Sequence, residues 1–439
     1  MGSVKTQDGV ASRNAPIGRA SMVAYGSGSL IIGMLNSVPT VLLLFFCTEI
    51  LGIAPAIAAA IILAPKIWIV FWDPLVGTWS DRSHSRWGRR APFILAGGAI
   101  SIVAFIGLFS PPDLRHAALI AAIAVAFFGL MTGYSLFKVP YVAIPTEITD
   151  DDDVRSRLIR SRTVFHMIGI LLGTAAAPFI VQAGGGGRPG YSLMAVSIGL
   201  VSIIGLVGPL AMLSHHAAQS KTAQSKTARN RSTDGILSQM GRALQEPRFR
   251  SLALAQVLQV TAIGLVSASL PYLVTRGMHR PQSDIGTTML FYLLPSIVAV
   301  SFWGFVGRKI GDGAAQGFSA LSYGLGSAAL GLCVLYGGSW PVFLATLPLL
   351  GIGFGGMQGQ SFTIAARIIH RAAGGTAQAT YTGMWTATER FGLALGPSLT
   401  GIALAIWGGT LATWSATAAP LLFLMSLPFL ARATRSSTT

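Results

Sequence analysis

Residues 72–93 read WDPLVGTWSDRSHSRWGRRAPF, which places a single carboxylate, Asp73, inside an apolar run and five more charged residues in the turn that follows. Those five are Asp81, Arg82, Arg86, Arg89 and Arg90. Only 10% of the 439 residues are charged and 52% are hydrophobic, so this segment concentrates charge that the rest of the chain avoids. An ionisable residue within an apolar run, followed by a basic turn, is typical of a membrane-spanning helix and the loop after it.

Apolar segments of 18 or more residues recur along the whole chain, and the mean hydropathy is +0.62. A helix needs about 20 such residues to cross a hydrocarbon core about 30 Å thick. The runs are continuous rather than alternating, which favours helices over barrel strands. We therefore predict an all-α polytopic membrane protein. Its twelve spans are predicted at residues 19–48, 54–79, 91–110, 117–146, 162–183, 190–213, 250–275, 284–307, 316–336, 341–366, 376–408 and 411–430.

The formal net charge of +16 is explained by topology rather than by nucleic acid. If both ends of the chain are cytoplasmic, four of the 31 Lys and Arg residues face outside and three (Lys66, Lys138 and Arg390) lie in the interior of spans. The remaining 24 fall in the tails, in the cytoplasmic loops or at the cytoplasmic ends of spans. This distribution obeys the positive-inside rule and predicts a cytoplasmic (inner) membrane protein with both termini in the cytoplasm. No nucleic-acid partner is expected, because no separate basic domain exists.

The predicted spans divide into two sets of six. The polar segment 214–249, which contains a short SKTAQ duplication, separates an N-terminal bundle at 1–213 from a C-terminal bundle at 250–439. The sequences GTWSDR at 77–82 and GFVGRK at 304–309 echo one another after the second span of each half. This pattern predicts the parallel repeats of a major-facilitator transporter, whose solute binds near the midplane between the halves.

Four segments resemble the glycoside-pentoside-hexuronide:cation symporters, the melibiose permease-like family. They are DPLVGTWSDRSHSRWGRRAPFILAGG at 73–98, AYGSGSL with FFCTEILGI at 24–53, VPYVAIPTEITDDDDVRSRLIRSR at 139–162, and GMWTATERFGLALGPSLTG at 383–401. They are also similar to the sodium-dependent lysolipid transporters of the same clan. The resemblance implies a secondary transporter whose partners are a small organic solute, the lipid bilayer and a coupling cation, with no cofactor. A sugar or glycoside is the family's usual solute, whereas the cations Lys66, Lys138, Arg162 and Arg390 would suit an anionic solute or an amphiphile with an acidic head.

The carboxylates of the family pattern are only partly present in this chain. Asp73 matches the second of two helix-2 carboxylates that hold the coupling cation, but the earlier position is Ile69. Lys138 stands where a helix-4 carboxylate is expected, and Gly33 replaces the helix-1 acid that binds sugar. Because a hard cation needs several oxygen ligands, our hypothesis is that the Lys138 ammonium pairs with Asp73 in place of sodium. Transport would then be sodium-independent, and both proton coupling and uncoupled facilitation fit.

The remaining candidate residues divide between the coupling network and the solute cavity. Arg390 matches a helix-11 Lys near the family's coupling site, and Glu389 is expected to pair with a neighbouring helix. Arg162 matches an Arg that contributes to sugar binding, or is an ordinary positive-inside residue. Lys66, two turns before Asp73, lines the cavity or snorkels to water. The side chains of Tyr25, Asn36, Tyr141 and Trp385 are predicted either to line the cavity or to pack in the core, and His166 either to shuttle protons or to pack there.

The charged turn is interpreted as a cytoplasmic gate. Asp81, Arg82, Arg86, Arg89 and Arg90 have the composition to pair across the two halves when the cytoplasmic side closes. A non-transporting membrane assembly or delivery factor is the alternative, because SDRSHSRWGRRAPF also looks like such proteins. An enzyme is not expected, since no paired carboxylates, nucleophile motif or metal-ligand spacing is present. A monomer is expected, with no metal site.

Overall fold

The computed structural model describes residues 18–83, 85, 87–149, 151–219, 245–372, 378–407 and 411–434. All regular structure within these residues is helical, which confirms the all-α prediction. The first half of the chain forms α1 (Arg19–Val38), α2 (Pro55–Arg82), α3 (Ala91–Phe109), α4 (His116–Ile148), α5 (Asp152–Leu171), α6 (Ala177–Ala183) and α7 (Gly187–Gln219). The second half forms α9 (Pro247–Tyr272), α10 (Ser283–Ile310), α11 (Asp312–Leu335), α12 (Trp340–Ala372), α13 (Gln378–Trp407) and α14 (Leu411–Thr434).

A helix lies over each of the twelve predicted spans. Eleven helical runs in the described part of the chain are long and apolar enough to cross a membrane. The remaining long helix, α13, has 30 residues and carries Glu389 and Arg390. Most of the predicted linker, at 220–244, lies outside the described residues.

Short π-helical turns extend three of the spans. They are η1 (Pro39–Leu43) and η2 (Phe46–Ile50) after α1, η3 (Leu172–Ala176) between α5 and α6, and η4 (Leu273–Gly277) after α9. Each of these spans is therefore a composite rather than one uninterrupted α-helix.

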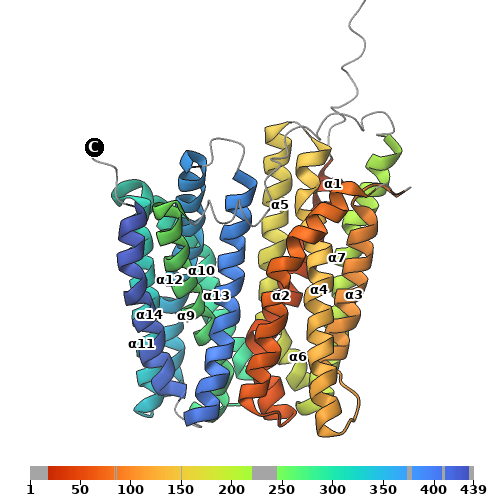
Figure 1. The fold of residues 1–439 in the computed structure, drawn as a ribbon. Helices are drawn as coiled ribbons and strands as arrows, with labels where there is room; N and C mark the ends of the chain where they lie inside the picture. The colour runs from red at the N-terminus through yellow and green to blue at the C-terminus, as the bar shows by residue number, and fades with distance from the viewer. Residues whose placement is uncertain are drawn as a thin grey trace, which may run out of the picture.

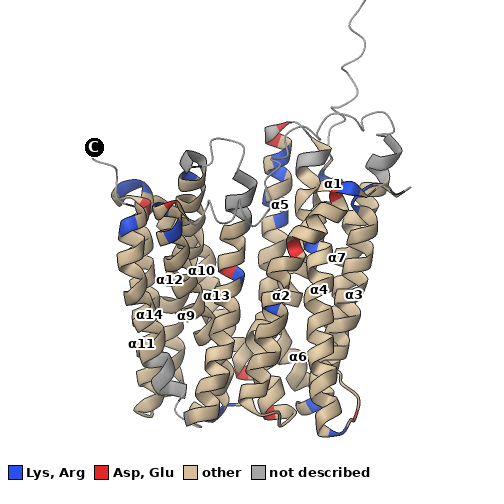
Figure 2. Ribbon diagram, in the orientation of Figure 1, with Lys and Arg blue, Asp and Glu red and all other residues tan. Residues whose placement is uncertain are grey.

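The helices form two groups that stand side by side, α1–α7 and α9–α14 (Figure 1). In the first group α1 packs on α5 and α7, and α3 packs on α4; in the second α9 packs on α13 and α14, and α11 packs on α12. We call the face where α1 begins and α14 ends the inner face, and the opposite face the outer face. Most of the Lys and Arg residues that are drawn in colour gather at the inner face (Figure 2).

Glycine permits the closest helix contacts within each group. A Cβ on Gly33 of α1 would lie 2.6 Å from the backbone oxygen of His166 in α5, which is closer than real contacts allow. In the second group, Gly396 of α13 faces the backbone of Gly264 in α9 in the same way. Small residues let helix backbones approach in membranes, where packing rather than hydrophobicity holds helices together. The close approach also explains why position 33 cannot carry the carboxylate of the family pattern.

The two groups touch mainly in the part of the molecule nearer the outer face. Helix α2 runs along α13, η1 contacts α9, and α10 contacts η3 and α6. Proceeding inward along α2, bonds to α13 are made by Ala59, Lys66 and finally Asp73. Asp73 lies nine residues before the end of α2 at Arg82, or about 14 Å from the inner end of the helix.

Helix α5 begins ten residues earlier than the span predicted at 162–183. The Asp151 side chain caps it by accepting hydrogen bonds from the backbone N–H groups of Asp153 at 2.8 Å and Val154 at 3.3 Å. Carboxylates at a helix N-terminus satisfy free N–H groups and complement the helix dipole. The acidic run at 150–153 thus starts a helix, and Arg162 lies about 15 Å into that helix rather than at its start.

Candidate functional site

An ion pair between Asp73 and Arg390 joins the two halves. The Arg390 guanidinium of α13 donates to Asp73 Oδ2, and the Ser135 hydroxyl of α4 donates to Oδ1. The side chains of Asp73 and Arg390 are only 23% and 13% exposed. A buried charge is tolerated only when it is paired and hydrogen-bonded. Three helices, α2, α4 and α13, therefore converge on one carboxylate.

The predicted pairing of Lys138 with Asp73 is wrong in this structure, because Arg390 occupies that place. Ser135 is the α4 residue that faces Asp73, and Lys138 lies three residues, or about 4.5 Å, further toward the inner face. The Lys138 ammonium lies 5.5 Å from the centre of the Tyr134 ring and within electrostatic range of Glu389 in α13. The four predicted charges thus form two opposite-sign pairings across the halves, one direct and one at longer range.

Lys66 makes a second link between α2 and α13. Its side chain is buried, and its ammonium donates to the backbone oxygen of Leu393 at 3.3 Å. That oxygen is free because the residue four positions on, Pro397, has no N–H to donate within the helix. Lys66 therefore does not snorkel to water; it donates to a carbonyl that a proline has left without its usual donor.

A compact polar cluster lies within the first half, between α1 and α4. The rings of Tyr25 and Tyr141 stack with their centres 4.8 Å apart. The Tyr141 hydroxyl donates to the backbone oxygen of Tyr25 at 2.6 Å and lies 3.0 Å from the Ser29 hydroxyl. The Tyr25 hydroxyl donates to the backbone oxygen of Tyr141 at 3.4 Å, which Pro145 leaves free in the helix. Both tyrosines are fully buried, so they pack and bond at the same time.

Helix α5 adds two basic side chains to this cluster. Arg162 is within hydrogen-bonding reach of the Tyr25 hydroxyl. His166 is half-buried, lies within electrostatic range of Lys138 and Arg162, and its Nδ1 has no hydrogen-bond partner among the described residues. Arg162 thus places positive charge beside the tyrosine hydroxyl groups, which suits recognition of an acidic group.

Two predicted cavity residues lie apart from these clusters. Asn36 is half-buried on α1, one turn beyond the closely packed Gly33. Trp385 is buried in a core of α9, α12, α13 and α14 residues, where Phe362 meets its ring edge-on with centres 6.3 Å apart. The Trp385 Nε1 finds no partner within the described part of the chain. The structure therefore gives Trp385 a packing role and keeps Asn36 separate from the charge network.

The charged turn after α2 pairs within the first half. Arg90 donates to Asp81 at 2.8 Å and to the Ser80 hydroxyl at 2.7 Å, so it ties the end of α2 to the start of α3. Arg82 and Arg89 are exposed, and Arg86 lies outside the described residues. The pairing across the halves that was expected of a cytoplasmic gate stays a prediction for the state in which the inner face is closed.

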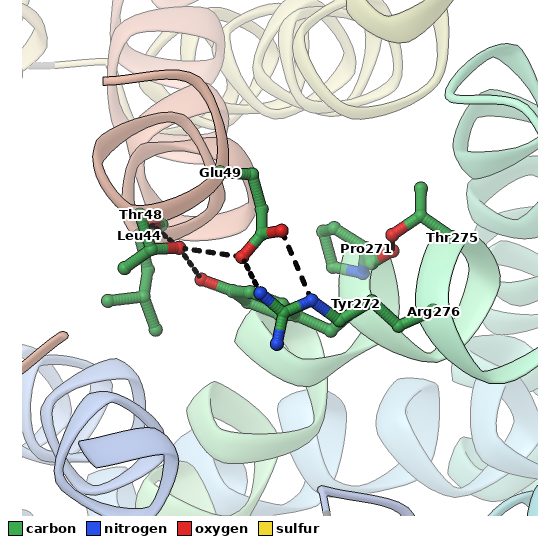
Figure 3. A network of polar contacts seen from close by, with 7 residues as sticks. All are labelled: Leu44, Thr48, Glu49, Pro271, Tyr272, Thr275 and Arg276. Carbon is green, nitrogen blue, oxygen red and sulfur yellow. Dashed lines mark hydrogen bonds and ion pairs between the residues drawn. The ribbon is translucent and has the colours of Figure 1, made fainter. Parts of the chain in front are cut away.

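Sequence reasoning missed both Ser135 and a contact at the outer face. There the Arg276 guanidinium binds Glu49 through two hydrogen bonds, and the hydroxyls of Thr48 and Tyr272 lie 2.7 Å apart (Figure 3). Glu49 is the one acidic residue at the outer end of the first predicted span. This isolated acidic residue could have indicated a contact at the outer face, but a sequence gives no distance between residues in different halves.

Comparison with known proteins supplies independent information. A family model described as MFS/sugar transport protein matches residues 24–431. An uncharacterized symporter of Synechocystis sp. is 33% identical over 196 residues, which are 42% of this chain and 35% of that protein. The alignment therefore spans about a third of that relative's length. The isoprimeverose transporter of Lactiplantibacillus pentosus is 22% identical over 88% of this chain and 80% of its own.

Solved structures agree with the fold. The crystal structure of the nucleoside transporter NupG superposes with a TM-score of 0.70 at 15% identity, over 95% of this chain and 100% of that chain. At this level of identity the similarity establishes architecture and nothing about the solute.

Proposed function

Because the chain belongs to the MFS/sugar transport protein family, we propose that it is a secondary transporter that moves a small organic solute across the cytoplasmic membrane by alternating access. The family membership agrees with the resemblance to melibiose permease-like symporters found in the sequence. The matched proteins are transporters rather than enzymes. The observation that carries the proposal is the Asp73–Arg390 ion pair, a partly buried charge pair shared by the two halves of the molecule.

The distribution of contacts between the halves supports an inward-facing state. The described bonds from α2 to α13 end at Asp73, and the inner end of α2 continues for nine more residues. At the outer face, by contrast, Glu49 binds Arg276. A rocking motion that separates the outer ends would bring the inner ends together. The gathering of basic residues at the inner face supports cytoplasmic termini by the positive-inside rule (Figure 2).

We propose that transport does not require sodium. Asp73 matches a family carboxylate for the coupling cation, and its two oxygens are already engaged by Arg390 and Ser135. A guanidinium that stays protonated at all ordinary pH values provides a permanent positive charge at this carboxylate. Arg390 thus replaces Lys138 as the internal counter-ion of the hypothesis, and the mechanistic consequence is unchanged.

For the solute, we propose a sugar- or glycoside-sized molecule that carries an acidic group. Arg162 and Lys138 each lie within electrostatic range of His166 and provide two positive charges near it. Stacked tyrosines beside them provide the aromatic surface and hydroxyl groups on which a sugar ring can pack. The relative named as an isoprimeverose transporter supports the sugar-like part of this class.

The test combines binding and flux, using the monomeric protein that we expect on purification. A thermal-shift screen of sugars, glucuronides, organic acids and lysolipids identifies a binder, because binding to the folded state raises the unfolding temperature. Uptake of that binder into proteoliposomes is then measured with sodium and with potassium as the sole alkali cation. Equal uptake in both salts is expected. Uptake that rises with sodium would refute the counter-ion proposal, and binding without any flux would refute transport.

A further inference from the structure

We propose that Thr48, Glu49, Tyr272 and Arg276 form the external gate, the contact that closes the outer face in this structure and breaks when a solute enters from outside. The inference rests on the alternating-access cycle proposed above. It adds to that cycle a set of residues at the opposite end of the molecule from the charged turn at 81–90.

The four residues form a set of directional hydrogen bonds between the two halves. Arg276 Nη2 donates to Glu49 Oε1 at 2.6 Å and Arg276 Nε donates to Glu49 Oε2 at 3.1 Å, so the guanidinium binds both carboxylate oxygens. The Thr48 and Tyr272 hydroxyls bond at 2.7 Å directly beside this pair (Figure 3). The Arg276 guanidinium also lies 5.8 Å from the centre of the Tyr272 ring. Bidentate pairing fixes direction as well as distance, so the contact is lost as a unit when the halves separate.

The gate residues occupy equivalent positions in the two halves. Thr48 and Glu49 lie in the π-helical turn η2, which follows the first long helix of the first half. Arg276 lies in η4, which follows the first long helix of the second half, and Tyr272 is the last residue before it. π-Helical turns inside helices are rare and occur often at functional sites. Their placement at both sides of one contact indicates that the contact is built for a purpose beyond packing.

The gate is open to water on its outer side. A cavity of about 320 Å³ lies beside it and is lined by the four-residue stretch from Gly52 to Pro55, by Leu404, and by Thr48, Glu49 and Arg276. The Glu49 and Arg276 side chains are 21% and 52% exposed. Partly hydrated ion pairs contribute modestly to stability, which is what a contact that breaks in every cycle requires. An incoming solute would meet these two charges first.

The test measures how often the outer side opens, without measuring flux. In a protein whose native cysteines are replaced (Cys47→Ala, Cys333→Ala), Asn36→Cys places a thiol on α1, 13 residues inward of Glu49. A membrane-impermeant thiol reagent is added outside right-side-out vesicles, and the labelling rate is recorded. Glu49→Gln and Arg276→Gln are each expected to raise this rate about three- to fivefold. The double variant should label no faster than either single variant, because the pair is already broken.

A matched control distinguishes the gate from any loss of outer charge. Arg280 and Asp284 form an ion pair at 2.7 Å, near the outer face but within the second half alone. Asp284→Asn should leave the labelling rate unchanged. The inference is overturned if Glu49→Gln leaves the rate unchanged, if Asp284→Asn raises it equally, or if the double variant shows the product of the single effects. If Glu49→Gln does not fold, Tyr272→Phe should raise the rate, and no rise would again overturn the gate.

Discussion

Substitution of Asp73 and Arg390, singly and together, tests the central ion pair. Asp73→Asn leaves a guanidinium that is 13% exposed without its counter-ion, and Arg390→Gln leaves a carboxylate that is 23% exposed. Removing one partner of a fully buried pair costs about 3–5 kcal/mol, whereas exposed pairs contribute about 0–1 kcal/mol. Partial burial places each single variant at about 2–3 kcal/mol of lost stability. The double variant should lose less than the sum of the two, because no unpaired charge remains.

The two single variants should also differ from one another. An unpaired carboxyl group can take up a proton and become neutral, and Asp73 keeps its bond from Ser135. An unpaired guanidinium cannot lose its charge in the same way. Thermal unfolding of detergent-purified protein, followed by tryptophan fluorescence, should therefore rank the proteins as wild type, double variant, Arg390→Gln and Asp73→Asn in order of decreasing stability.

The outer-loop pair Arg188–Asp113 is the control for this series. It is a close ion pair at 2.5 Å, and its carboxylate is 94% exposed, so Asp113→Asn should cost less than about 1 kcal/mol. The reasoning is refuted if Asp73→Asn shifts the unfolding temperature no more than Asp113→Asn. It is also refuted if the Asp73 and Arg390 effects add without coupling.

Three further substitutions test other parts of the structure. Lys66→Met should lower the free energy of unfolding by about 1–3 kcal/mol, because it leaves the Leu393 carbonyl buried without a donor. The same unfolding assay measures this change, and an unchanged unfolding temperature would show that water replaces the ammonium. Tyr141→Phe removes the bond to the Tyr25 backbone and should cost about 1–2 kcal/mol, with stability unchanged if that bond is not formed in solution. Asp81→Asn should reduce the rate of solute uptake while the thermal shift that the solute produces stays the same; an unchanged rate would contradict a role in gating.

Sequence periodicity and composition predicted the architecture well, because hydrocarbon imposes a strict length and hydropathy on each spanning segment. All twelve predicted spans contain a helix. The predicted start of the fifth span was wrong, because a capping side chain rather than hydropathy determines where that helix begins. Helix α5 starts at Asp152 because Asp151 caps it, and the polar residues that follow gave no apolar signal.

The candidate site was predicted less completely. The sequence singled out Asp73, Lys138, Glu389 and Arg390 as one charge network. Which cation pairs with Asp73 depends on the rotation of α4 about its axis and on whether the Arg390 guanidinium, in the second half of the molecule, reaches the carboxylate. The pattern of apolar and polar residues along one helix determines neither. For the same reason Trp385, which reads equally well as a cavity or a core residue, could only be assigned once its neighbours were known.

The bond from Lys66 to the Leu393 carbonyl has a consequence for how this protein can evolve. The two residues are 327 positions apart, yet the bond exists because Pro397 withholds a donor from its own helix. If the lysine is lost first, a buried carbonyl is left without a donor. If the proline is lost first, the restored N–H and the ammonium can share the same carbonyl, which has two lone pairs. The lysine is therefore expected to change in related lineages only with or after the proline.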